Sequence, residues 1–311
     1  MTTGVQPQAS SDFDQDRAEY EKESRRYRTT RRIRAAGAYT ILTIFVLMAV
    51  GPVIYLISPA FRDSVSLFAY PPQWIPRNPS LENIRFLFTH TGYARWALNT
   101  VILASGATIL TLITNTLAGY AFARLSFPGK KVIFFAVLAT LMVPVAAVLA
   151  PTYLLVREIG TWPIIGKPII GLDTYGGLIL PLSVSPLGVF MMRQFIQTLP
   201  VGLYEAAKLD GASDWRILRK IVLPLIKPAL VVLAIFVFMM QWAQFLWPLV
   251  ATSGDKYRVL TVGIASLNGQ FVTNWGVMAA AALLTLIPIT IVFLFFQRWF
   301  VQASMAGALK Q

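Results

Sequence analysis

The 311-residue sequence contains no cysteine and a single histidine, His90. Without cysteine the chain can form neither a disulfide framework nor a thiolate metal or redox site. The lone histidine is expected to be a solvated side chain in a loop, which leaves no means of building a common zinc site or a Cys-His or Ser-His catalytic pair. The sequence therefore excludes the most frequent metal-binding and nucleophilic classes of enzyme.

Charged residues are also scarce. They make up 13% of the chain, whereas hydrophobic residues make up 56%, and soluble proteins contain about 25% charged residues. So few polar side chains could not cover the surface of a water-soluble globule, and the composition predicts an integral membrane protein. The net charge of +13 comes from basic residues beside apolar segments, where they face anionic lipid, so the expected partner is the lipid bilayer and not nucleic acid.

Six apolar segments are each long enough to cross a hydrocarbon core, which requires about 20 residues of helix. They predict an all-α polytopic membrane protein with six transmembrane helices, at residues 36–58, 97–123, 132–156, 174–192, 228–251 and 276–297. The fourth is the weakest because prolines and glycines interrupt it, which membrane helices tolerate when neighbours satisfy the freed backbone groups. None of the six contains Asp, Glu, Lys, Arg or His.

The distribution of Lys and Arg predicts the orientation of these spans. If the N-terminus is cytoplasmic, 19 of the 27 basic residues lie on the cytoplasmic side, so both termini are expected there. Residues 1–34 are predicted to be a disordered cytoplasmic tail, and residues 35–311 a transmembrane domain with its core at about 95–297. The first apolar stretch is too long for a signal peptide and is expected to be retained.

The absence of Asp, Glu, Lys, Arg and His from the spans limits the energy sources that the protein could use. Carriers coupled to ions or protons keep such side chains within the bilayer, so the pathway suits a neutral solute and lacks an evident means of using an ion gradient. ATP is the alternative, but the chain has no phosphate-binding loop, and its nearest run, FPGKK at 127–131, lacks the required glycine spacing and the Ser/Thr. Another polypeptide would have to hydrolyse ATP.

One charged stretch interrupts the apolar sequence, EAAKLDGASDWRILRKIVLPLIKPAL at 205–230. Pro200 can start a short helix, Gly211 suits the left-handed residue at its end, and Ser213 can cap a second helix. We call residues 198–227 the elbow and its first helix the tip helix. Pro224 and Pro228 are expected to break the chain as it enters the fifth span.

The two helices of the elbow differ in character. The second is expected to be amphipathic, with Arg216, Arg219 and Lys220 turned away from an apolar face formed by Trp215, Leu218, Ile221, Val222 and Leu225. Such a helix beside a membrane can be only an interfacial anchor. The tip helix instead suits a protein partner, because Ala206 and Ala207 add little bulk and Glu205 can pair with a partner's base.

The pattern E-A-A-x3-G-x9-I-x-L-P closely resembles the EAA loop of ABC importer permeases. All seven of its positions match, at Glu205, Ala206, Ala207, Gly211, Ile221, Leu223 and Pro224. The resemblance covers nearly the whole chain after about 35 residues and is closest to the six-span carbohydrate permeases of the maltose-transporter type. Supporting stretches are PPQWIPRNPSLENIRFLF at 71–88, AFARLSFPGKK at 121–131, LPLSVSPLGVFMMRQF at 180–195 and FQRWFVQASMAGALK at 296–310.

This resemblance implies a type I ABC importer (MetI-like) permease fold in the inner membrane of a bacterial or archaeal cell. The EAA loop, with Asp210 among its residues, would dock into a cleft on a dimer of cytoplasmic ABC ATPase subunits, where Glu205 would pair with a basic residue. The ATPase would bind and hydrolyse ATP, so the permease itself would be no enzyme and hold no cofactor. A second permease, expected to be a homologue, and an extracytoplasmic sugar-binding protein would complete the importer.

A few polar and aromatic residues within the spans are candidates for the solute pathway. Two amides and two indoles lie together at the end of the fifth span, where WAQFLWPL replaces the Trp-Asn-Asp-Phe-Leu-Trp-Pro-Leu often found in the family, and an amide and a hydroxyl lie in the second: Gln241, Trp242, Gln244, Trp247, Asn115 and Thr116. Gln241 and Gln244 are expected on one helical face. The alternative is that these side chains only join helices or mark the membrane interface.

Two other functions remain open on the sequence. The chain could be a self-sufficient carrier, channel or membrane receptor whose elbow is only an anchor, although the uncharged spans disfavour a carrier and the complete EAA pattern disfavours an anchor. Since the EAA loop is shared across importer subtypes, the solute could also be a peptide or an amino acid.

Overall fold

The computed structural model describes residues 8–62, 74–76, 78–162, 169–268 and 274–308. The chain divides into two compact units, Met1–Leu56 and Ile57–Gln311, and each is described by itself. This division falls later than the predicted boundary between residues 34 and 35.

Unit 1 is formed by helix α1, Gln8–Ala60, whose last residues belong to unit 2. The helix covers residues 8–34, which the sequence predicted to be disordered, while residues 1–7 lie outside the described part. The segment from Gln8 to Ala36 contains neither glycine nor proline and is rich in Arg, Ala and Glu, which favour helix. It therefore continues the helix of the apolar segment that follows it.

Unit 2 is built from helices, and its described residues contain no β-strand. In chain order its helices are α2 (Glu82–His90), α3 (Tyr93–Arg124), α4 (Lys130–Ala139), α5 (Val145–Ile159), α6 (Tyr175–Ile179), α7 (Pro186–Gln197), α8 (Val201–Leu209), α9 (Asp214–Ile217), α10 (Leu223–Leu225), α11 (Lys227–Trp242), α12 (Leu246–Ala251), α13 (Leu260–Ser266) and α14 (Trp275–Ala308). Short 3-10 turns follow α4 (Thr140–Met142) and α6 (Leu180–Leu182), and a π-helical turn (Leu218–Val222) joins α9 to α10.

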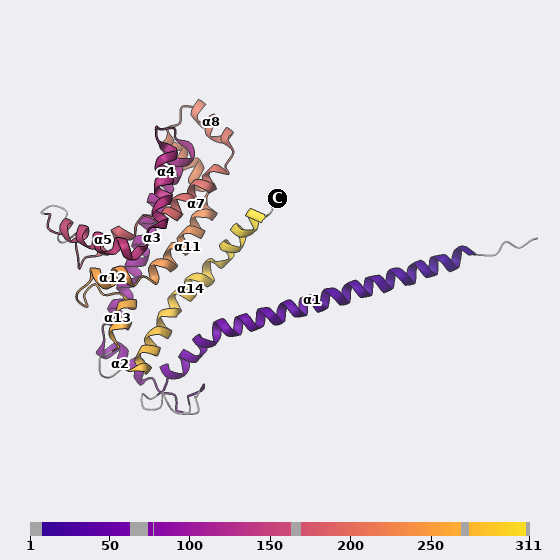
Figure 1. Ribbon diagram of the computed structural model, residues 1–311, viewed down its shortest axis with the longest axis horizontal. Coiled ribbons are helices and arrows are strands. Elements are labelled where there is room, and N and C mark those ends of the chain that lie inside the picture. Colours follow the sequence, from indigo (N-terminus) through magenta and orange to yellow (C-terminus); the bar gives the residue numbers. More distant parts are fainter. Residues whose placement is uncertain (1–7, 63–73, 77, 163–168, 269–273, 309–311) are drawn as a thin grey trace, which may run out of the picture. The chain divides into compact units, whose positions relative to one another are not determined.

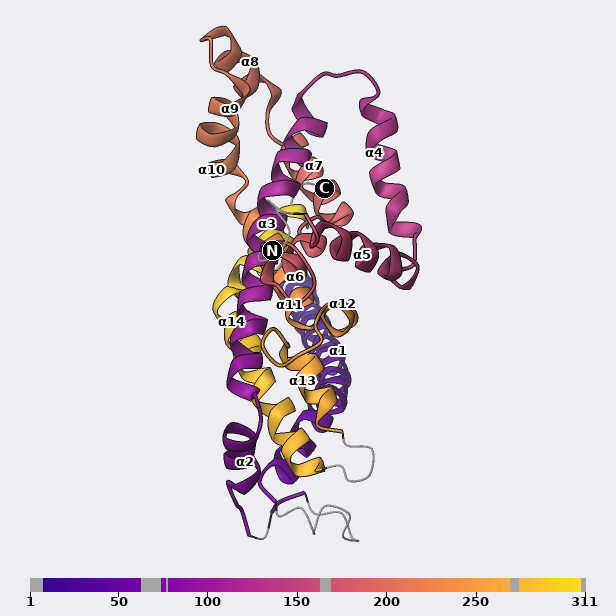
Figure 2. The same ribbon diagram turned by 90° about the vertical axis from the view of Figure 1, so that its left-hand side faces the viewer.

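Helix α3 is the central element of unit 2. It packs most extensively against α7 and α11 and also touches α6 and α13. Figures 1 and 2 show α8 at one end of the unit and α2 at the other, with α3 running between them. Apolar clusters surround α3 along its length, one around Met192, Ile217 and Leu233 near α8 and another around Leu87 and Leu260 near α2.

The apolar helices give three straight spans and up to three bent ones, so the six predicted spans correspond to the upper count. Three helical segments are long and apolar enough to cross a membrane alone: Thr29–Ala60, Tyr93–Arg124 and Trp275–Gln297. Up to three more spans come from bent pairs: Lys130–Met142 with Val145–Ile159 (106°), Tyr175–Leu182 with Pro186–Gln197 (52°) and Asp214–Leu225 with Lys227–Trp242 (78°). The chain is a multi-pass membrane protein.

A proline lies at each of the three bends. Pro144 precedes α5 with an extended backbone, Pro186 lies at the start of α7 and Pro228 lies in the first turn of α11. Proline cannot continue the hydrogen bonds of a preceding helix, so it favours a break at these places. The break in the fourth span and the break before Lys227 were predicted. The bend in the third span was not, and the fifth span, predicted as one helix over 228–251, stops at Trp242 before α12 begins at Leu246.

Candidate functional site

The turn of the elbow has the geometry that its sequence predicts. Gly211 has a φ of +76°, the left-handed conformation that glycine adopts at little cost. The N–H of Gly211 donates to the carbonyl of Lys208 (3.0 Å), and the N–H of Ala212 donates to that of Ala207 (2.9 Å), which together form a Schellman C-cap. The Ser213 hydroxyl then accepts from the N–H of Arg216 (3.4 Å) and caps α9.

Replacement of Gly211 by alanine tests this turn. No atom lies within 4 Å of a Cβ placed there, so the cost comes from the backbone conformation alone, about 1–2 kcal/mol. We expect Gly211→Ala to loosen the link between α8 and α9 and to leave the spans intact, measured as faster amide hydrogen exchange confined to residues 201–217. Gly202→Ala is the control because its Cβ would also meet nothing within 4 Å and its backbone is helical. Equal exchange in both variants would contradict the prediction.

The tip helix α8 presents two of its three EAA side chains to the exterior. Glu205 and Ala206 are exposed, as is Asp210 at the end of the helix. Ala207 is buried instead, and it packs into the apolar cluster of this chain that contains Ile217. The prediction that Ala207 leaves room for a partner's surface is therefore wrong, because a larger side chain there would meet the chain's own core.

The second helix of the elbow buries a different face from the one predicted. Leu218 and Val222 are buried as expected, with Ile217 beside them, but Trp215 and Leu225 are 62% and 48% exposed. The π-helical turn at Leu218–Val222 explains the change, since its extra residue shifts the register of the side chains. Of the remaining EAA residues, Ile221 and Leu223 are half-buried and Pro224 is exposed.

Asp214 is the polar centre of the elbow, and the sequence did not single it out. Its carboxylate accepts from the Tyr204 hydroxyl (2.8 Å), from the Lys208 ammonium (2.9 Å) and from the hydroxyl of Tyr120 in α3 (3.2 Å). The hydrogen bond to Asp214 raises the pKa of Lys208 above its ordinary value. Asp214 directly follows the Ser213 cap, where an acidic residue favours a helix start. The position of Asp214 beside the cap could have marked it in the sequence. Its contact with Tyr120 could not be read there, because the two residues are 94 positions apart in the chain.

Two of the candidate pathway residues meet at the break in the fourth span. The Gln241 amide donates to the carbonyl of Leu182 (3.3 Å), and the Asn115 side-chain oxygen accepts from the N–H of Ser185 (3.3 Å). Thr111 also donates to Leu182 (3.2 Å). These side chains thus form hydrogen bonds with backbone groups that the broken helix leaves unpaired. Within a membrane such backbone groups need partners from the protein itself.

The other candidates do not share this place. Trp242 packs in the cluster with Leu87, and Trp247 donates its indole N–H to the carbonyls of Gly177 (3.2 Å) and Leu178 (3.1 Å). Gln244 lies beyond the end of α11 and is half-exposed, so the prediction that it shares a helical face with Gln241 is wrong. Six buried polar side-chain atoms have no hydrogen-bond partner among the described residues. Four belong to the candidates, Asn115 Nδ2, Thr116 Oγ1, Gln241 Oε1 and Trp242 Nε1, and the other two are Trp96 Nε1 and Thr108 Oγ1.

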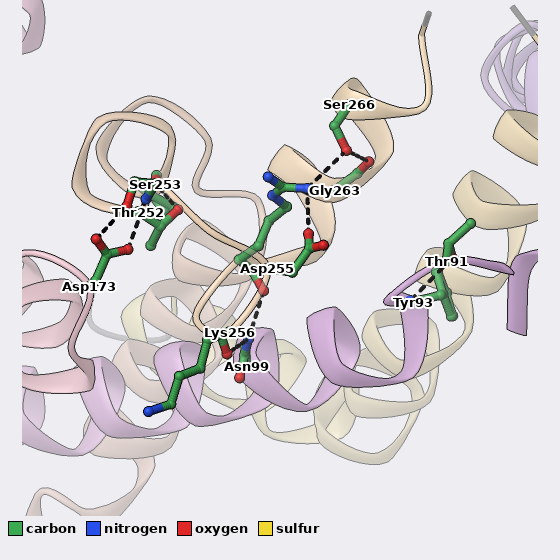
Figure 3. Close-up of polar contacts among 12 residues, drawn as sticks. Thr91, Tyr93, Asn99, Asp173, Thr252, Ser253, Asp255, Lys256, Gly263 and Ser266 are labelled. Atoms are coloured by element: carbon green, nitrogen blue, oxygen red, sulfur yellow. Dashed lines mark hydrogen bonds and ion pairs between the residues drawn. The ribbon is translucent and has the colours of Figure 1, made fainter. Parts of the chain in front are cut away.

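A second polar cluster lies near the start of α3 and was also missed (Figure 3). The Asn99 amide donates to the carbonyls of Lys256 (3.0 Å) and Arg258 (2.8 Å) and so holds the loop between α12 and α13. Asp173 accepts from the N–H (2.8 Å) and the hydroxyl (2.5 Å) of Ser253 in the same loop. Asn99 and Tyr120 are 21 residues apart on one helix, which places the two clusters about 30 Å apart.

Comparison with known sequences matches the chain to one protein family and to permease proteins of several transport systems. Residues 115–304 match the family described as binding-protein-dependent transport system inner membrane component. The arabinooligosaccharides transport system permease protein AraQ of Halalkalibacterium halodurans is 34% identical over 266 residues, covering 85% of this chain and 92% of AraQ. The sn-glycerol-3-phosphate transport system permease protein UgpE of Pectobacterium atrosepticum is 32% identical over 273 residues, covering 85% of this chain and 94% of UgpE.

A solved structure shares the fold. A chain of a bacterial ABC transporter involved in the import of the acidic polysaccharide alginate superposes with a TM-score of 0.73 over 86% of this chain and 97% of its own length, at 21% identity. This agreement confirms the predicted all-α MetI-like permease fold. The identity is low enough that the comparison speaks for the fold alone.

Proposed function

The chain belongs to the family of binding-protein-dependent transport system inner membrane components, and from this premise we propose that it is the permease subunit of an ATP-driven carbohydrate importer. The elbow is the element that docks on a separate ATPase. One observation carries this assignment. Helix α8 lies at one end of unit 2 (Figure 2) with Glu205 exposed, while Ala207 anchors its opposite side in the core.

The elbow suits docking better than lipid anchoring. An interfacial helix needs a continuous apolar face, yet the second helix of the elbow buries Leu218 and Val222 within the chain. The tip helix α8 is short, capped at its end by the Gly211 turn and fastened to Asp214 through two side chains. A rigid element of this kind transmits a displacement instead of absorbing it.

The solute is proposed to be a neutral saccharide. AraQ is named for arabinooligosaccharides and UgpE for sn-glycerol-3-phosphate, so relatives at similar identity carry both neutral and anionic cargo. The six spans predicted from the sequence contain no Asp, Glu, Lys, Arg or His, and a phosphorylated solute would be expected to meet a cation in its pathway. The uncharged spans therefore favour the neutral class over phosphates, peptides and amino acids.

The importer would contain further subunits. We place both termini in the cytoplasm, with a dimer of ABC ATPases below the elbow that binds the ATP. A homologous second permease would form the other half of the pathway. An extracytoplasmic binding protein would deliver the sugar at the end of α3 that holds the loop at 252–259. The self-sufficient carrier is disfavoured because the family is described as a component of a binding-protein-dependent transport system, and because the exposed tip helix offers a surface for a partner.

Purification of the tagged chain from its own cells in mild detergent tests the proposal. We expect it to copurify with an ABC ATPase, a second permease and a solute-binding protein, all identified by mass spectrometry. The binding protein can then be titrated with neutral oligosaccharides and with glycerol 3-phosphate. Recovery of the chain alone, under conditions that preserve a known ABC complex, would contradict the assignment and support a self-sufficient carrier.

Among the pathway candidates, Gln241 and Asn115 are proposed to face the solute, because each leaves one amide atom without a partner among the described residues. Trp242, Gln244 and Trp247 are proposed to support this wall, Trp247 through its indole contacts with α6.

Replacement of Gln241 by leucine should weaken transport and preserve the fold. Thr111 still donates to the Leu182 carbonyl in this variant, so no backbone acceptor is stranded. Loss of one hydrogen bond to the solute costs about 1 kcal/mol, or about fivefold in apparent affinity. The measurement is concentration-dependent uptake of labelled sugar into proteoliposomes that hold the whole complex. Gln194→Leu is the control because Gln194 is exposed on α7, and equal uptake constants in the two variants would remove Gln241 from the pathway.

A further inference from the structure

Both ends of the segment that carries α8 are attached to the last turns of α3. Before α8, the Arg124 guanidinium donates to the carbonyls of Ile196 (2.9 Å) and Leu199 (2.7 Å). After α8, the Tyr120 hydroxyl donates to the Asp214 carboxylate (3.2 Å) and to the backbone carbonyl of Asp214 (3.3 Å). Tyr120 and Arg124 are four residues apart, one helical turn. The tip helix is thus bracketed between two attachments to one span.

Asp214 connects these two attachments to the tip helix itself. Besides Tyr120, its carboxylate accepts from Tyr204 (2.8 Å) and Lys208 (2.9 Å), both on α8. A carboxylate has two acceptor oxygens and can take all three donors, whereas the amide of asparagine has only one acceptor oxygen. The Tyr120 ring and Ala207 also belong to one buried apolar cluster, so packing reinforces the polar contacts.

We propose that Asp214 is a positioning residue that fastens α8 to α3, so that a displacement of α8 is passed to the second span. This inference rests on the proposed docking of the elbow on an ATPase. Helix α3 is suited to pass the motion on. Its Thr111 and Thr114 hold the carbonyls of Leu182 (3.2 Å) and Ser183 (2.7 Å) at the break of the fourth span, and its Asn99 holds the loop at 252–259.

The fastening is not needed merely to keep the chain folded. The side chains of Lys208 and Asp214 are 39% and 41% exposed, and exposed ion pairs contribute about 0–1 kcal/mol. The buried cluster of Ile217, Leu218 and Val222 holds the elbow in place without them. Asp214→Asn and Tyr120→Phe each remove one part of the fastening with little change in size, so both variants are expected to assemble.

The test uses the complete importer in proteoliposomes and measures sugar molecules imported per ATP hydrolysed. We expect Asp214→Asn and Tyr120→Phe to retain the ATPase subunits and their hydrolysis but to lower this ratio about fivefold or more, the scale of a typical coupling free energy. Asp214→Glu should restore much of the ratio, because it retains both acceptor oxygens. Tyr153→Phe is the matched control, since the Tyr153 hydroxyl lies in a different cluster, around Val156.

The distance between α8 and α3 can be measured to test directly whether the two helices move together. Because the chain has no cysteine, spin labels at Val201→Cys on α8 and Ile113→Cys on α3, both at exposed sites, are unique within this chain, and the complex is assembled with cysteine-free partner subunits. We expect their separation to stay constant between the nucleotide-free and ATP-bound complexes of the otherwise unchanged chain, and to change when Asp214→Asn is added.

The outcomes separate the two proposals. A normal ratio in Asp214→Asn with a low ratio in Glu205→Lys would overturn the fastening and leave the docking site standing. Normal ratios in both variants would overturn both proposals. If Asp214→Asn lost its ATPase subunits and Asp214→Glu failed to restore transport, Asp214 would have only a structural role, which also overturns the inference.

Discussion

Reversal of the charge at Glu205 (Glu205→Lys) is expected to reduce sugar uptake to near background while the chain stays folded in the membrane. Glu205 is exposed on α8, and the ion pairs found among the described residues do not include it. Its replacement therefore breaks no ion pair among the described residues. At a docking interface, however, loss of one partner of a charge pair costs about 2–5 kcal/mol, which corresponds to a loss of about thirtyfold or more in affinity.

The measurement is uptake by the reconstituted complex, together with the amount of ATPase that remains bound to the tagged permease after washing. Glu158→Lys is the matched control because Glu158 is also exposed, at the end of α5 and away from the elbow. We expect the control to transport and assemble normally. Normal uptake and normal ATPase retention in Glu205→Lys would contradict docking at this residue.

Substitution of Gly119 is expected to have a large effect on folding. Helices α3 and α7 approach closely here, and a Cβ at Gly119 would lie 2.6 Å from Met192 Cβ and 2.9 Å from the backbone nitrogen of Arg193. Because backbone atoms are involved, the helices would have to separate. Overpacking of a core costs about 1–3 kcal/mol, and we expect Gly119→Val to reach or exceed the upper end of this range.

The expected result is a lower unfolding temperature of the detergent-purified protein, together with a lower yield from membranes. Gly119→Ala should show much of the same effect because the Cβ itself causes the clash. Gly51→Val in α1 is the control, since nothing lies within 4 Å of a Cβ there. If Gly119→Val unfolded at the same temperature as this control, the close approach of α3 and α7 would not matter to stability.

The positions of the apolar segments could be predicted because they depend on the length and composition of local sequence. Apolar runs of about 20 residues without charge have few other uses, and prolines such as Pro186 mark breaks through their own covalent geometry. The bend at Pro144 was missed although the signal was present. The end of α11 at Trp242 was not predictable in this way, since no proline or glycine occupies residues 243–245.

In the elbow, too, some features could be predicted from the sequence and others could not. The order of its helices, the turn at Gly211 and the cap at Ser213 follow from the chain's own residues, because capping bonds connect neighbours in sequence. The face that the second helix buries did not follow, since the π-helical turn at Leu218–Val222 shifted the register. Nor did the burial of Ala207, which depends on the core packed behind it.

The sequence by itself thus determined the class of this protein, the positions of its apolar segments and the position of its elbow, because each rests on local hydrophobicity, backbone conformation or a motif of fixed spacing. Only the tertiary structure decided what the elbow is attached to. Tyr120 meets Asp214 across 94 residues, and Gln241 meets Leu182 across 59. Such contacts exist only after the helices pack, because hydrogen bonds act over a few ångströms in space regardless of distance along the chain.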